Sequence, residues 1–166
     1  MESHRPVGAA SRRLIAISLL LCAFAAASDP PSLAPVTVCE ILADLPAHDG
    51  KNYAVLGRYS FRRDGRWIGE DACGAAQGIL TLNEDSSAPR PPGDLDLDTA
   101  VLNKKFAELL KHTVLGKFKF GTPEYDRWAV VFGRVEAHKA EDHNRKTAAD
   151  LVFRGSGVVV FLTTER

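Results

Sequence analysis

The order of short strand-like segments around a single long helix is the feature that most constrains the fold. Residues 99–115 carry apolar side chains at i, i+4, i+7 and i+8, the spacing of an amphipathic helix. Residues 138–150 are expected to form a polar loop. Segments rich in β-branched and aromatic residues, separated by turn-forming residues, predict five strands at 53–62, 66–70, 78–83, 128–137 and 157–163. The chain is therefore mainly β, in the order β-β-β-α-β-β.

Five short strands with one helix between the third and fourth are typical of a small OB-like barrel. We expect the long helix to plug one end of this barrel. The alternative is an open α+β sheet with the helix packed on one face. A short helix over 38–45 precedes the barrel, because Thr37 and Glu40 form a T-x-x-E capping box and Pro46 follows as a stop signal. A chain of 166 residues has room for one domain of this kind.

Three groups of residues carry a resemblance to a known set of proteins. They are Asp49-Gly50-Lys51 with Val55-x-Gly57-Arg58, then Gly69-Glu70-Asp71-x-Cys73, and finally Val130-x-x-Gly133-Arg134-Val135. This pattern resembles small exported bacterial OB-fold-like proteins of acidobacterial type, which have no assigned function. The resemblance covers about residues 36–83 and 128–137. It implies a barrel architecture and brings no catalytic residue with it.

The N-terminal segment has the three parts of a secretory signal peptide. Arg5, Arg12 and Arg13 precede an uncharged apolar run at 14–27, which ends in the small residues Ala25-Ala26-Ala27. The run holds 14 residues, and a membrane span needs about 20. We therefore expect cleavage and a secreted or periplasmic protein without a transmembrane span. An uncleaved anchor helix is the alternative.

Cleavage divides the chain into a signal peptide at 1–28, a proline-rich linker at 29–36 and a single domain at 37–166. The whole chain has 21 basic and 21 acidic residues, and the signal segment contains three basic residues and one acidic residue. The mature chain thus has a net charge of −2, which argues against a dedicated nucleic-acid binder.

Cys39 and Cys73 are the two cysteines that remain after cleavage. A pair of cysteines in an oxidising compartment predicts one disulfide, with two unpaired thiols as the alternative. Closing a loop of about 34 residues would stabilise the fold by roughly 3–4 kcal/mol in the chain-entropy model.

A basic and aromatic stretch in the first hairpin is the candidate ligand-binding site. Arg58, Arg62, Arg66 and Trp67 lie there with aromatic residues between them, around the turn signal Asp64-Gly65. OB-folds bind single-stranded nucleic acids by stacking bases on aromatic side chains while cations follow the phosphates. Arginine stacked on Trp67 would also suit anionic glycans. Alternatively, the aromatic side chains fill the barrel and the arginines form a solvated hairpin tip.

These features favour a non-enzymatic binding or interaction module of the cell envelope. Its partner would be a polyanion (a glycan or an oligonucleotide) or another envelope protein. The alternative is a small envelope hydrolase or metal-dependent enzyme built on His138, Glu141 and His143. The sequence has no nucleophile elbow, phosphate loop or dinucleotide fingerprint, so we assign no catalytic residue, metal ligand or cofactor.

Overall fold

Seven strands join into one sheet in the computed structural model, which describes residues 32–63, 65–71, 73, 78–93, 95–112, 126–139, 147–155 and 157–163. The strands are β1 (Val36–Thr37), β2 (Asn52–Arg62), β3 (Gly65–Gly69), β4 (Ile79–Glu84), β5 (Asp126–Ala137), β6 (Ala149–Phe153) and β7 (Val158–Leu162). The helices are α1 (Val38–Ala43), α2 (Leu45–His48) and α3 (Thr99–His112).

Five of the strands close into a barrel in the order β2-β3-β4-β6-β5, with β5 returning to β2. The closing pair is antiparallel and runs from Asn52 opposite Arg134 to Ser60 opposite Asp126. Strands β4 and β6 are parallel, and the other barrel pairs are antiparallel. This closed mixed barrel fits the predicted OB-like architecture rather than an open sheet. Strands β1 and β7 lie outside it, beside β2 and β5.

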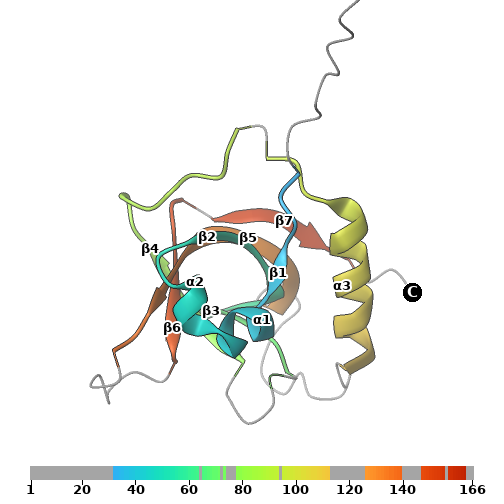
Figure 1. Cartoon of the computed structure of the whole chain (residues 1–166), viewed down its shortest axis with the longest axis horizontal. Coiled ribbons are helices and arrows are strands. Elements are labelled where there is room, and N and C mark those ends of the chain that lie inside the picture. The colour runs from blue at the N-terminus through green and yellow to red at the C-terminus, as the bar shows by residue number, and fades with distance from the viewer. Residues whose placement is uncertain are drawn as a thin grey trace, which may run out of the picture.

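The barrel interior is filled by apolar side chains, and α1 supplies two of them. Val38 and Ile41 of α1 are fully buried in the same core as residues from the barrel strands, among them Val55, Ile68, Leu80, Val131, Leu151 and Phe153. Figure 1 looks at the barrel with α1 and α2 in front of its opening and α3 beside its wall. The expectation that the long helix plugs the barrel is therefore wrong, because the short helix α1 does so.

Helix α3 instead covers the outer face of β2 and β5. Leu102 and Leu109 pack into a second buried cluster with outward-facing residues of these strands, and the Phe106 ring meets the Trp128 ring edge-on at a centroid distance of 5.6 Å. Successive residues of a strand point to opposite faces of the sheet. A strand that is apolar on both faces must therefore pack against other parts of the protein on both. Strands β2 and β5 have two apolar faces, and α3 covers the outer one.

Strand β6 is the main departure from the predicted elements. The fifth barrel strand is Ala149–Phe153, which begins inside the expected polar loop, whereas the predicted last strand is β7, outside the barrel. All five residues of β6 are buried, so the segment has no alternating pattern. Asp150, its second residue, is charged, and the sequence pattern therefore assigns the start of this strand to the polar loop.

The N-terminal elements also differ in detail. The sequence pattern predicts that Pro46 stops the first helix, but α1 ends at Ala43 and Pro46 lies in the first turn of α2, where a residue needs no N–H donor. Before α1, the Leu33 N–H donates to the Asp96 carbonyl at 2.7 Å, and the Asp98 N–H donates to the Leu33 carbonyl at 3.2 Å. The last part of the expected linker thus pairs with the segment that enters α3. No helix of the described residues is long and apolar enough to cross a bilayer.

Candidate functional site

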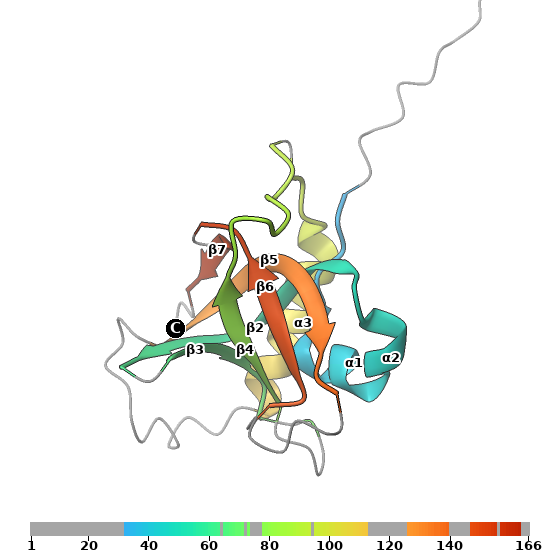
Figure 2. The same cartoon turned by 90° about the vertical axis from the view of Figure 1, so that its left-hand side faces the viewer.

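Strands β2 and β3 project as a ribbon on the side of the barrel opposite α1 and α2 (Figure 2). Directly opposite residues of an antiparallel pair share a face. Tyr59 lies opposite Ile68 and Arg127, and Phe61 lies opposite Arg66. Because Ile68 belongs to the barrel core, the inner face of the barrel continues along this ribbon.

Strand β7 extends the same surface. Phe161 lies opposite Ala129, a residue of the barrel core, and its ring meets the Tyr59 ring edge-on at a centroid distance of 6.2 Å. We call this surface the aromatic–arginine face. It comprises Tyr59, Phe61, Arg66, Arg127 and Phe161.

Two phenylalanines on the aromatic–arginine face are unusually accessible. Phe61 is 41% exposed and Phe161 is 47% exposed, and they are the exposed large apolar side chains of the described residues. A single exposed apolar residue is ordinary. Two on one surface, rimmed by cations, are typical of an interaction site.

An arginine lies over each of these rings. Arg66 Cζ is 5.4 Å from the Phe61 ring centroid, and Arg127 Cζ is 5.7 Å from the Phe161 ring centroid. Both distances are within the range of cation–π attraction. A stacked guanidinium keeps its N–H groups at the edge of its plane, where they can donate in pairs to a carboxylate, sulfate or phosphate.

The four residues singled out from the sequence divide between two surfaces. Arg66 belongs to the aromatic–arginine face, whereas Arg58 and Trp67 alternate with it and point to the outer face of the ribbon. Arg58 forms an ion pair with Asp71 at 3.3 Å. Arg62 pairs with Gly65 through its strand, and its side chain lies outside the described residues.

The sequence reading missed Arg127 and Phe161. They come from β5 and β7, and only strand pairing brings them to the ribbon. The alternative reading of the aromatic residues holds for one of them, since Tyr59 is partly buried against the barrel core while Phe61 is exposed.

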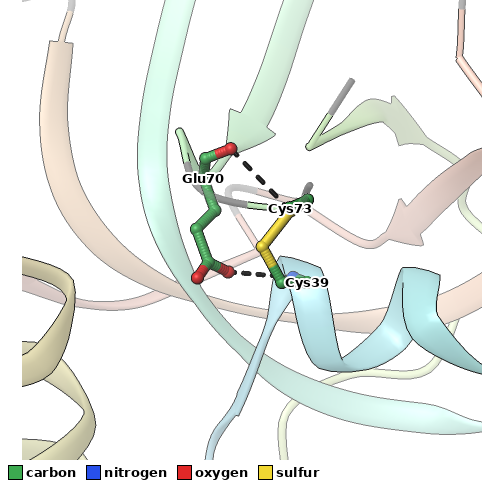
Figure 3. Close-up of side chains that lie close together, drawn as sticks. All are labelled: Cys39, Glu70 and Cys73. Carbon is green, nitrogen blue, oxygen red and sulfur yellow. Dashed lines mark hydrogen bonds between the residues drawn. A yellow bond between two sulfur atoms is a disulfide. The ribbon is translucent and has the colours of Figure 1, made fainter. Parts of the chain in front are cut away.

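The predicted disulfide joins Cys39 of α1 to Cys73, with a Cα–Cα distance of 4.9 Å. Glu70, which follows β3, lies beside it (Figure 3). One Glu70 carboxylate oxygen accepts a hydrogen bond from the Cys39 N–H at 2.8 Å, in the first turn of α1. The disulfide and this bond together tie the helix that plugs the barrel to the segment after β3.

Cys39, Glu70 and Cys73 are also the group of potential metal ligands found among the described residues, with donor atoms within 4.8 Å of one another. Metal ions bind the thiolate form of cysteine. Sulfur atoms joined in a disulfide are not thiolates, so we assign this cluster to the attachment of α1.

His138 has a structural role in the described residues. Its Nε2 lies 2.9 Å from an Asp150 carboxylate oxygen, and its Nδ1 donates to the Thr147 carbonyl at 2.7 Å. The second Asp150 oxygen accepts from Asn83 at 2.6 Å. Both imidazole nitrogens contact oxygen atoms of the fold, so we assign His138 a structural role. Glu141 and His143, the other residues of the enzyme hypothesis, lie outside the described residues.

The fold and this surface define a small OB-like β-barrel with an exposed aromatic and cationic face. Comparison with protein-family models, with curated proteins and with solved structures finds no match for this chain. The resemblance to small exported bacterial proteins therefore stays a prediction.

Proposed function

We propose that this protein is an exported, non-enzymatic module of the cell envelope that binds a polyanionic chain on its aromatic–arginine face. The observation that carries the proposal is the pairing of each exposed phenylalanine ring with a guanidinium, Arg66 over Phe61 and Arg127 over Phe161. Each pair presents a fixed cation above an apolar base.

This arrangement favours oxyanion groups over stacked bases as the units recognised. The guanidinium already covers one face of each ring, so an approaching ligand meets N–H donors there. Arg66 is also 3.9 Å from Glu84, but both side chains are well exposed, and such surface pairs are worth about 0–1 kcal/mol. A ligand anion can therefore compete for this arginine.

Export is supported by the basic and apolar N-terminal segment and by the disulfide. Expression of the full chain in a bacterial host tests it. Mass spectrometry of the extracytoplasmic fraction should find a protein that begins near Asp29. Recovery of the uncut chain in the membrane fraction would instead support the anchor alternative.

Binding is best tested with fluorescein-labelled heparin oligosaccharides and a single-stranded oligonucleotide, by anisotropy at several salt concentrations. The double variant Arg66→Ala/Arg127→Ala should weaken binding about tenfold or more and flatten its salt dependence. Arg66→Lys keeps the charge but loses the planar fork, and should give an intermediate loss. The charge-matched control is Lys51→Ala/Lys104→Ala, which removes two cations from exposed side chains outside the aromatic–arginine face. Equal affinity of the arginine double variant and this control would overturn the proposal.

A further inference from the structure

A second cationic feature lies where β4 ends and the turn after β6 begins. An open pocket of about 540 Å³ is found here. Its cationic side chains are Arg90, from the loop after β4, and Arg154, from the β6–β7 turn; its lining residues are Glu84, Ser86, Arg90, Pro91, Arg154 and Gly155.

The two sides of this pocket are held together by backbone pairing. Glu84 lies opposite Phe153 at the end of the parallel β4–β6 pair, and the Asp85 N–H donates to the Phe153 carbonyl at 2.9 Å. The loop then closes on itself, because the Ala88 N–H donates to the Asp85 carbonyl at 3.0 Å. Ala88 is only 3% exposed and anchors the loop. These contacts hold the loop after β4 against the end of β6.

The charge of the pocket is positive. Within the described part of the chain, neither Arg90 nor Arg154 forms an ion pair with a carboxylate. The acidic residue of the lining is Glu84, whose carboxylate lies 3.9 Å from Arg66. Two arginines at one pocket suit an oxyanion, because guanidinium N–H groups match the oxygens of carboxylate, sulfate and phosphate.

Glu84 also connects the pocket to the aromatic–arginine face. It follows the core residues Leu80 and Leu82 at a spacing of two along β4, so the three side chains share the inner face of the sheet. Arg66 belongs to that same face and contacts Glu84. One continuous surface therefore leads from the exposed phenylalanines past Arg66 to Arg90 and Arg154.

We propose that the Arg90–Arg154 pocket is a second oxyanion subsite, and that the ligand is a linear acidic polysaccharide long enough to reach it from the aromatic–arginine face. This inference rests on the proposed function. A polysaccharide is favoured because a guanidinium covers one face of each exposed phenylalanine ring, which leaves nucleobases less ring face for stacking, whereas an acidic polysaccharide needs only the guanidinium N–H groups for its oxyanions. The disulfide also supports export, and an exported protein meets the glycans of the envelope.

Heparin oligosaccharides of two lengths, a disaccharide and a decasaccharide, test the inference. The double variant Arg90→Ala/Arg154→Ala should bind the decasaccharide about tenfold more weakly and the disaccharide as well as the wild type does. The charge-matched control is Lys51→Ala/Lys104→Ala, two exposed lysines away from both surfaces. All variants should have the wild-type melting temperature, because the substituted side chains are exposed.

The remaining outcomes separate the two proposals. If Arg90→Ala/Arg154→Ala binds the decasaccharide like the lysine control while Arg66→Ala/Arg127→Ala weakens it, the second subsite is wrong and the proposed function stands. If neither arginine pair affects binding, both fail. If inorganic sulfate binds the pocket as tightly as the decasaccharide, or an oligonucleotide of equal charge binds more tightly, the polysaccharide assignment is overturned.

Discussion

Lys105 of α3 donates a hydrogen bond to the carboxylate of Glu40 in α1. The same Glu40 oxygen accepts the Thr37 N–H at 2.8 Å and so completes the capping box of α1. One carboxylate therefore caps the helix that plugs the barrel and joins it to the helix outside the barrel wall.

This arrangement predicts a loss of stability in acid. Partial burial tends to raise the pKa of Glu40, but the hydrogen bonds from Lys105 and Thr37 and the charges of Lys105 and His48 outweigh it and lower the pKa below the ordinary 4.5. The stabilisation is present above the unfolded-state pKa and is lost as the pH falls through the lower folded-state pKa. Thermal melts from pH 7 to pH 3 should show a smaller acid-induced loss for Glu40→Gln than for wild type. Lys105→Met should reduce the loss similarly, and an unchanged slope in both variants would contradict this role.

The disulfide and Glu70 predict a second pair of effects. Cys39→Ser/Cys73→Ser should lower the free energy of unfolding by about 2–4 kcal/mol. Glu70→Ala removes the acceptor for the Cys39 N–H and should cost about 1–2 kcal/mol. Glu70→Gln keeps an oxygen acceptor and should cost less. Urea unfolding with and without a thiol reductant measures these values, and equal stability of Glu70→Ala and wild type would exclude a capping role.

The close packing at Gly57 predicts a loss of stability on substitution, and Gly93 provides the control position. A Cβ at Gly57 would lie 2.7 Å from Ile68 Cγ1 and 3.2 Å from Val38 Cγ2, between the barrel wall and α1. Gly57→Ala should therefore destabilise the protein by about 1–3 kcal/mol. At Gly93 an added Cβ would meet nothing within 4 Å, so Gly93→Ala should be neutral or slightly stabilising. Similar unfolding midpoints for both variants would disprove this account of how α1 fits.

The His138–Asp150 contact predicts energetic coupling. Both side chains are almost fully buried, and removal of either one deletes this contact from the other. Asp150→Ala and His138→Ala should each cost about 1–3 kcal/mol, and the double variant should cost clearly less than the sum. Binding of heparin oligosaccharides should not change. Additive effects in urea unfolding would show that the two side chains act independently.

Much of the barrel could be predicted from the sequence because its strands and hairpin have strong local patterns. Residues 53–62 and 128–137 became β2 and β5 with small changes at their ends, and the Cys39–Cys73 pairing is confirmed. Strand β6 could not be recognised, because a short strand buried on both faces has no period and Asp150 interrupts its apolar run. The role of α1 could not be predicted either, because only two of its residues, Val38 and Ile41, are buried. Two apolar residues are too few to reveal a helix face in the sequence.

The candidate site could be predicted from the sequence only in part, for a different reason. Arg66 and Phe61 belong to one hairpin and can be read from local sequence. Arg127 and Phe161 belong to strands far along the chain, and their proximity depends on the pairing of β5 with β2 and β7. Strand alternation then separates Arg58 and Trp67 from Arg66, although all three are close in sequence.

The position of α1 in the chain also has a consequence for the order in which the protein folds. Helix α1, which plugs the barrel, precedes every barrel strand in the chain, whereas β5 and β6, which complete the wall, are the last two barrel strands. The disulfide needs only the chain up to Cys73, so it can form before the later strands have taken their places. Helix α1 would then already be linked covalently to the segment after β3. The remaining barrel strands would assemble around a helix that is already in position.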